Sequence, residues 1–136
     1  MELKEETIKD LISKAIKMLE YSYVPYSHFH VGAALLANNG TIYTGCNIEN
    51  AAYGPSNCAE RTAVFKAVSE GVKEFEAIAV VGGTDGRIKD FCPPCGVCRQ
   101  VLAEFCTRDF KVILAKSIDE YKVFTLEQLL PESFSL

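Results

Sequence analysis

The sequence predicts an α/β fold: a single three-layer domain with a five-stranded mixed sheet and helices on both faces. Short apolar runs of strand length alternate with segments of helical periodicity, which is typical of layered α/β proteins. A turn signal, Asn38-Asn39-Gly40, separates the first two runs. The 136 residues, of which 49% are hydrophobic, suffice for one core but not for two. We therefore treat residues 1–136 as one domain.

The first third of the chain predicts a helix followed by a hairpin. Apolar residues between Leu3 and Leu19 recur at three- and four-residue steps, the pattern of an amphipathic helix that ends before Pro25. Segments 30–36 and 41–45 flank the Asn-Asn-Gly turn and predict two antiparallel strands.

The remaining chain alternates helices with strands. Residues 46–57 and 82–94 are rich in Gly, Pro, Asn or Asp and predict loops. We expect helical crossovers between the later strands, because helical segments separate them. The expected helices are 58–68, 95–105 and a short one around 126–130, and the expected strands are 75–81, 110–115 and 121–124.

Charge and hydropathy argue against two classes of partner. Fourteen Lys and Arg against eighteen Asp and Glu give a net charge of -4, without a basic run that could follow a phosphate backbone, so nucleic-acid binding is disfavoured. No stretch of about 18 apolar residues occurs, and the N-terminal residues do not form an export signal. We predict no membrane association and a cytoplasmic location.

The spacing of the cysteines predicts a catalytic zinc site. In a reducing compartment, six cysteines favour metal binding or catalysis over disulfides. Cys58 opens one predicted helix, and the run Pro-Cys-Gly-Val-Cys that ends at Cys98 opens another. Three thiolates fill three corners of a tetrahedron around zinc and leave the fourth for water. We expect Cys58, Cys95 and Cys98 to hold one Zn²⁺ per chain.

Two charged side chains near Cys58 are expected to act at this site. Glu60 lies two residues further on and is the predicted general acid and base, which moves protons without binding the metal. Three thiolates on a divalent cation leave a net charge of about -1, which weakens the acidity of bound water. Helix N-termini and Arg61, through a hydrogen bond to a ligand sulfur, are expected to withdraw part of that charge.

Other uses of the cysteines and histidines remain open at this point. Cys95 and Cys98 are also spaced like a redox pair, and Cys92 could complete a closed structural site of four cysteines. The remaining cysteines, Cys46 and Cys106, are interpreted as small core residues. The two histidines, His28 and His30, are interpreted as surface or packing residues.

Five segments in order, spread over nearly the whole chain, resemble a known family. They are Phe29–Ala34, Gly45–Tyr53, Cys58–Arg61, Pro94–Gln100 and Leu129–Pro131. Together they resemble the small homotetrameric zinc-dependent cytidine deaminases, whose zinc-and-glutamate chemistry is shared with other deaminases. The resemblance implies a cytidine deaminase-like fold and hydrolytic deamination of cytidine or deoxycytidine to uridine or deoxyuridine plus ammonia, in pyrimidine nucleoside salvage. It also implies a homotetramer with shared active sites.

The resemblance also implies contacts to the nucleoside. Asn47 and Glu49 would hold the ribose 3′-hydroxyl, and Phe29 would stack beside the pyrimidine. Two residues apart on an extended segment, Asn47 and Glu49 point the same way and offer both a donor and an acceptor. A phosphate at this point would face the Glu49 carboxylate without a basic cluster to compensate, so we expect nucleosides to be preferred over nucleotides.

Four further contacts are implied by the resemblance. The backbone carbonyl of Ala59, together with that of Cys95, would accept a hydrogen bond from the 4-amino group of the base. Tyr53 and Phe134 would complete the site across a subunit boundary, with Phe134 packed over the ligand of a neighbouring subunit.

Three rival functions share parts of this pattern. The first is the same chemistry on another aminopyrimidine, such as blasticidin S, whose deaminase has a similar zinc motif; Asn47 and Glu49 argue against it. The second is deamination within RNA or DNA, which the acidic net charge disfavours. The third is a non-catalytic zinc-stabilised interaction module, in which Glu60 would be dispensable.

Overall fold

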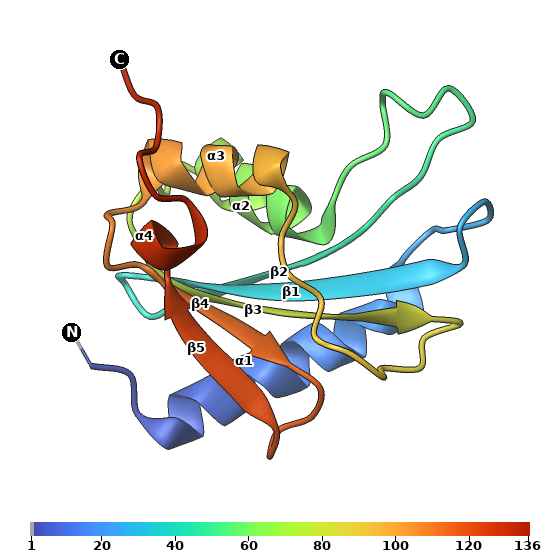
Figure 1. The fold of residues 1–136 in the computed structure, drawn as a ribbon, viewed down its shortest axis with the longest axis horizontal. Helices are drawn as coiled ribbons and strands as arrows, with labels where there is room; N and C mark the ends of the chain where they lie inside the picture. Colours follow the sequence, from blue (N-terminus) through green and yellow to red (C-terminus); the bar gives the residue numbers. More distant parts are fainter. Residues whose placement is uncertain (1) are drawn as a thin grey trace.

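A five-stranded mixed sheet forms the centre of the protein, as the sequence predicts (Figure 1). The computed structural model describes residues 2–136. The strands are β1 (Phe29–Ala37), β2 (Ile42–Cys46), β3 (Phe75–Thr84), β4 (Lys111–Ala115) and β5 (Tyr121–Thr125). Their order across the sheet is β2-β1-β3-β4-β5, and β3 and β4 run parallel whereas the other neighbouring pairs are antiparallel.

Helices cover both faces of this sheet and produce the predicted three layers. On one face lies α1 (Glu5–Lys17), continued by the 3₁₀ turn η1 (Met18–Tyr21). On the other face lie α2 (Ala59–Ser69) and α3 (Gly96–Phe105), in contact with each other (Figure 1). The short helix α4 (Leu126–Leu129) follows β5. Within residues 2–136, no helix has the length and apolar character that a membrane span requires.

Successive strand residues alternate between two hydrophobic cores. In β1, Leu35 packs in the core shared with α2 and α3, whereas Leu36 packs in the core shared with α1. In β3, Ile78 and Ala79 separate in the same way. Because helices cover both faces, alternate side chains are apolar on both sides, and the strands read as nearly continuous apolar runs.

The end of β3 differs from the expectation that a loop begins at Gly82. The strand continues through Gly82 and Gly83 to Thr84, paired with the start of β1. A Cβ on Gly83 would lie 2.0 Å from the Arg87 carbonyl oxygen. These glycines lie inside the sheet and allow the chain that returns after β3 to pack closely against the strand. In the sequence, glycines used in this way look the same as glycines of a loop.

The connection to β5 also differs from expectation. A helical crossover, α3, joins β3 to β4, as predicted. β5 instead returns antiparallel to β4 through the short segment 116–120, where the Lys116 N–H donates to the Glu120 carbonyl at 2.9 Å. Five residues are too few for a crossover, so the predicted helical connection is wrong here.

The helices α2 and α3 begin next to each other and thereby position the predicted metal site. Cys58 is the N-cap of α2 and Cys95 is the N-cap of α3, both with extended backbone conformation. The α2 start can approach β2 closely because of Gly45: a Cβ there would lie 2.2 Å from the Ala59 carbonyl oxygen.

Candidate active site

Three cysteine sulfurs converge where α2 and α3 begin. Cys58 and Cys95 cap the two helices and Cys98 lies in the first turn of α3, with the three Sγ atoms within 4.8 Å of one another. The Cys58 and Cys95 sulfurs are 4.0 Å apart. Zn–S bonds of about 2.3 Å at tetrahedral angles place two sulfurs about 3.8 Å apart, so these donors fit one zinc ion. Among residues 2–136, the only group of three or more metal-ligating side chains is this one.

The surroundings favour the thiolate form of Cys58. Hydrogen bonding from the Cys98 thiol and from the Arg61 guanidinium lowers the pKa of the Cys58 thiol to about 5. The pKa of Cys98 is raised in turn, by its hydrogen bond to Cys58 and by burial. A thiolate already present at neutral pH is the form that binds a metal, and binding releases the protons that remain.

Arg61 supplies the positive charge that was expected beside a ligand sulfur. Its Nη2 donates to the Cys58 Sγ at 3.0 Å. Its Nε is buried and has no hydrogen-bond partner among the described residues. A buried N–H without a partner is costly unless strong negative charge lies nearby, and three thiolates on a divalent cation provide such charge. The residues present therefore fit a bound zinc ion.

Glu60 is a buried carboxyl group in the first turn of α2. Only 5% of the residue is exposed, and it is the only charged or polar residue in the described chain that is this deeply buried. Burial, with a further contribution from the charge of Cys58, raises the pKa of Glu60 to about 7. Such a buried carboxyl group next to a metal-ligand cluster is typical of a catalytic acid or base.

A cavity of about 550 Å³ joins these groups to the predicted sugar-binding residues. Its walls include two of the cysteine ligands, Glu60 and Arg61, together with Asn47 and Glu49. The remaining lining residues are Val31, Tyr53, Gly54, Ser56, Asn57, Ala59, Cys92, Pro93 and Val97. The volume is in the range of sites for small molecules.

Asn47 and Glu49 are held in place by the chain around Phe29. The Asn47 Oδ1 accepts the Val31 N–H at 2.9 Å, and its Nδ2 donates to the Phe29 carbonyl at 2.8 Å. The Glu49 Oε1 accepts the N–H groups of Tyr26 and Ser27 at 3.0 and 3.1 Å. Each side chain is therefore fixed in orientation, which a sugar-binding pair requires.

The other three predicted contact residues, which are aromatic, lie in three different surroundings. Tyr53 lines the cavity, with 75% of the residue exposed and a positive φ of 62°. Phe29 lines a separate cavity of about 130 Å³, and Val31, two residues further along β1, takes its place in the main cavity. Phe134 is 67% exposed near the chain end, where its carbonyl accepts from Gln100 Nε2 at 3.1 Å.

The expected role of two backbone carbonyls disagrees with the structure. The Ala59 carbonyl lies inside the first turn of α2 against the α-carbon of Gly45, so it faces the sheet. The Cys95 carbonyl accepts the Arg99 N–H at 3.0 Å as the first hydrogen bond of α3. In contrast, the Ala59 N–H is one of the free donors at the start of a helix. At Ala59, the backbone group that the helix leaves without a partner is therefore the N–H and not the carbonyl.

The alternatives for the other cysteines are decided by distance and burial. Cys92 lines the cavity but lies outside the cluster of three sulfurs, so the four-cysteine structural site is wrong for the described residues. Burial raises the pKa of Cys92, and likewise that of Cys106, to about 12. Cys106 packs against the core and Cys46 is buried, as predicted.

The histidines have the structural roles expected of them. His28 is exposed, and His30 Nδ1 is hydrogen-bonded to Ser22 Oγ. Neither belongs to the metal-ligating cluster of the described chain.

Sequence reasoning missed several residues that line the cavity. Val31 carried a signal, because alternation along β1 places it on the same face as Phe29. Asn57, Cys92 and Pro93 reach the cavity only because two loops fold toward each other. Ser27, which donates to Glu49, also had no local signal.

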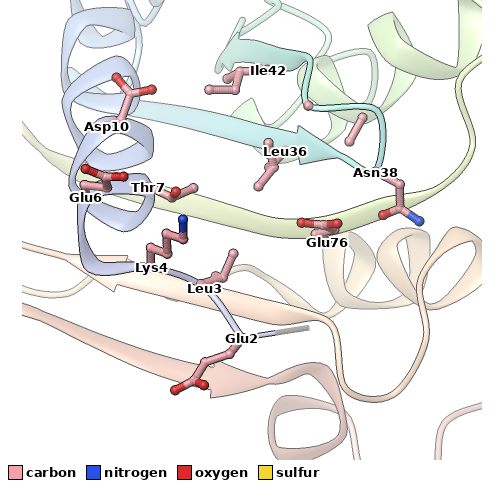
Figure 2. Close-up of a pocket in the computed structure, with 12 residues that line it drawn as sticks. Glu2, Leu3, Lys4, Glu6, Thr7, Asp10, Leu36, Asn38, Ile42 and Glu76 are labelled. Atoms are coloured by element: carbon pink, nitrogen blue, oxygen red, sulfur yellow. The ribbon is translucent and has the colours of Figure 1, made fainter.

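A larger hollow of about 700 Å³ lies elsewhere, between the start of α1 and the sheet (Figure 2). Glu6 and Asp10 reach it from α1 and Glu76 from β3, as Figure 2 shows. It contains no cysteine or histidine, and its carboxylates form no metal-ligating group among the described residues. The chemistry of the chain is therefore concentrated in the smaller cavity.

Comparison with known proteins agrees with this site. Residues 5–114 match the family model described as the cytidine and deoxycytidylate deaminase zinc-binding region. The chain belongs to this deaminase family. Within the family, the chain is 54% identical to a cytidine deaminase of Sporosarcina psychrophila over 94% of its own length and 91% of the relative. It is 52% identical to a cytidine deaminase of Halalkalibacterium halodurans, over 92% of each chain.

Solved structures of cytidine deaminases share the fold. The crystal structure of cytidine deaminase from Burkholderia pseudomallei superposes with a TM-score of 0.84 at 46% identity, over 92% of this chain and 97% of that chain. The enzyme from Mycobacterium tuberculosis superposes with a TM-score of 0.81 at 36% identity, over 99% and 100% of the two chains. The predicted cytidine deaminase-like fold is confirmed.

Proposed function

We propose that this chain hydrolyses cytidine and deoxycytidine to uridine and deoxyuridine plus ammonia, with one zinc ion per chain. The observation that carries the proposal is the position of Glu60, buried beside three convergent sulfurs in a cavity that also contains Asn47 and Glu49. Such a site brings a metal, a proton carrier and sugar-binding groups within reach of one nucleoside. We treat residues 1–136 as a single cytidine deaminase-like domain, and we place the reaction in pyrimidine nucleoside salvage in the cytoplasm.

The residues of the chain account for the movement of protons. The sulfurs of Cys58, Cys95 and Cys98 would hold the zinc ion, which would act as a Lewis acid and make bound water more acidic. The Glu60 carboxylate accepts a proton from the attacking water and donates it to the ring nitrogen N3; it then accepts the second proton, from the hydroxyl now on C4, and delivers it to the departing amino group. C4 gains the oxygen of water and loses ammonia. Arg61 donates a hydrogen bond to the Cys58 sulfur and withdraws part of its negative charge, which would preserve the acidity of the bound water.

Other groups orient the nucleoside. Asn47 and Glu49 bind the 3′-hydroxyl of the sugar, and the Ala59 N–H at the start of α2 donates to the pyrimidine carbonyl oxygen. Phe29 stacks beside the base, and Tyr53 and Phe134 complete the site between subunits of a homotetramer. The exposure of Tyr53 and Phe134 in the single chain supports such a shared site.

The matched family covers both nucleoside and nucleotide deaminases, and the charge of Glu49 favours nucleosides. A phosphate near this carboxylate would be repelled. We expect cytidine to be deaminated at least about 100-fold more efficiently than cytidine monophosphate, a difference of roughly 3 kcal/mol. Comparable kcat/KM values for the two substrates would contradict the preference.

The central test combines zinc removal with a Glu60→Gln variant. We expect the wild-type protein to release ammonia from cytidine, to lose this activity on chelation and to regain it with zinc. Glu60→Gln should keep its fold and one zinc per chain, while kcat falls by about 10²- to 10⁴-fold. Glu104→Gln, on the exposed face of α3, serves as the matched control.

Two outcomes of this test would favour the rival functions. If neither the zinc-loaded wild-type protein nor Glu60→Gln deaminates cytidine, while both keep their fold and zinc, the carboxylate is dispensable, as in a zinc-stabilised interaction module. Turnover of blasticidin S or of cytosine within a single-stranded oligonucleotide, in place of cytidine, would assign the same chemistry to another substrate.

A further inference from the structure

One turn of the chain surrounds the Glu49 carboxylate with hydrogen-bond donors. The turn, formed by residues 24–28, lies between η1 and β1. Its backbone gives two N–H groups to Glu49 Oε1, from Tyr26 at 3.0 Å and Ser27 at 3.1 Å. The Ser27 hydroxyl donates to the other oxygen, Oε2. Both carboxylate oxygens are thus held from one side.

These contacts limit what Glu49 can still accept. A carboxylate offers about four lone-pair positions, two on each oxygen. The two N–H groups use both positions on Oε1, and the Ser27 hydroxyl uses one of the two on Oε2. One acceptor position is left, on Oε2. Asn47, which lines the same cavity, keeps one free N–H, because its Oδ1 and one Nδ2 hydrogen are bound to β1.

The turn that carries Ser27 is itself fixed to the segment that carries Glu49. Tyr23 N–H donates to the Asn47 carbonyl at 3.0 Å, and Glu49 N–H donates to the Tyr23 carbonyl at 2.8 Å. Within the turn, His28 N–H donates to the Val24 carbonyl at 3.0 Å. The donor and the carboxylate therefore keep a constant relative position.

We propose that Ser27 is a positioning residue for substrate binding: its hydroxyl orients the Glu49 carboxylate so that the free lone pair of Oε2 accepts one sugar hydroxyl. This inference rests on the proposed function, in which Glu49 binds the 3′-hydroxyl. The hydrogen bond from Ser27 also lowers the pKa of Glu49, so the carboxylate stays ionised. Without the Ser27 hydroxyl, Oε2 is free to rotate or to bind water, and the orientation is lost.

The test compares Ser27 variants on substrates with and without the hydroxyl. We expect Ser27→Ala to raise the KM for cytidine about 5- to 20-fold with kcat changed less than about twofold, the effect of one lost hydrogen bond to a charged group. For 3′-deoxycytidine, which lacks the hydroxyl, the same variant should change the KM less than about twofold. Ser27→Thr should retain the wild-type KM, because it keeps a hydroxyl.

Controls separate this role from a general structural one. Ser69→Ala removes a hydroxyl that donates only to the Lys66 carbonyl at the end of α2, and should leave both KM values unchanged. Zinc content and thermal unfolding identify folded variants, and Ser27→Cys replaces Ser27→Ala if the latter does not fold. If Ser27→Ala raises the KM for cytidine and for 3′-deoxycytidine equally, while the wild-type protein prefers cytidine, the role of Ser27 is wrong. The proposed function would stand in that case.

Failure of the proposed function gives a different result. If the wild-type protein does not deaminate cytidine, or uses both nucleosides equally well, the assignment of Glu49 to the sugar is wrong and the role of Ser27 falls with it.

Discussion

Glu49 shows how much the immediate neighbours decide about a single functional group. As a sequence position, it is a glutamate after an Asn-Ile pair; in the structure, it accepts three hydrogen bonds from one turn. Cys58 is similar, since Arg61 and Cys98 together favour its thiolate. For Cys58 the sequence predicted Arg61 as a partner, whereas the turn that sets the charge and direction of Glu49 was not predictable.

The pH dependence of KM should reveal the contact between Ser27 and Glu49. The pKa of Glu49 is lowered, first by the Ser27 hydroxyl and then by the backbone N–H groups and His28. Because the pKa is lowered, Glu49 is ionised at any pH above the ordinary pKa of a glutamate. The ionised form is lost only at a lower pH. In Ser27→Ala this pKa rises, so the ratio of its KM to the wild-type KM should increase about twofold between pH 7 and pH 4.5.

Initial-rate measurements over this pH range, with cytidine as substrate, check the prediction. The ratio is used because the titration of other groups affects both proteins alike. A ratio that stays constant or decreases on acidification would show that Ser27 does not act on the ionisation of Glu49.

Replacement of Arg61 should affect catalysis more than metal retention. Arg61→Ala removes the donor at 3.0 Å from the Cys58 sulfur, and the negative charge of the ligand set then reduces the acidity of bound water. We expect kcat to fall about 10- to 100-fold while zinc content stays near one per chain. Steady-state kinetics with metal analysis measure both, and Arg108→Ala, at an exposed arginine, is the control. Unchanged kinetics would disprove this role.

Among the elements, the contact between α2 and β2 determines where the site forms. The first turn of α2 contributes the Cys58 ligand and Glu60, and it lies against Gly45 of β2 without room for a side chain. The pattern of apolar residues predicted both elements correctly. It did not predict how closely the two elements approach each other. A glycine in a strand has the same sequence signature whether it faces solvent or a helix backbone.

Gly45→Ala should therefore destabilise the protein and disturb the metal site. The new Cβ would lie 2.2 Å from the Ala59 carbonyl oxygen and 2.6 Å from the Ala63 nitrogen, so α2 must move away from β2. We expect the free energy of unfolding to fall by about 3 kcal/mol, with weaker zinc retention. Gly96→Ala, whose Cβ would meet no atom within 4 Å, should cost little. Thermal unfolding of both variants gives the comparison; equal stabilities would contradict the close contact.

For the whole molecule, the exposure of the aromatic residues supports the proposal that one chain leaves the site incomplete. Phe29 lies outside the main cavity, and Tyr53 and Phe134 are largely exposed. Exposed aromatic side chains are typical of surfaces that a partner covers, and Tyr53 also lines the ligand cavity. This agrees with a homotetramer in which each site borrows residues from a neighbour.

Mixed oligomers test whether Phe134 acts on a neighbouring site. Glu60→Gln and Phe134→Ala subunits should each be weakly active alone, the latter through a KM raised about tenfold by loss of a buried aromatic contact. In reassembled mixtures, an intact Glu60 can meet an intact Phe134 from another subunit, and activity at low cytidine should exceed the sum of the parents. Light scattering should give a mass near four times 15.0 kDa. Purely additive activity would place Phe134 in its own subunit's site or in none.

The sequence by itself determined the fold class, the helices and strands apart from one strand end and the connection to β5, and the residues that we propose to bind zinc and carry protons. These features depend on local periodicity and on short motifs, because a helix start that carries a cysteine and a glutamate is specified within a few residues. Only the tertiary structure decided that Cys92 is a wall of the cavity, that the Ala59 carbonyl packs against Gly45, and that Ser27 meets Glu49. The reason is physical: these roles depend on distances between segments far apart in the chain, and packing sets such distances.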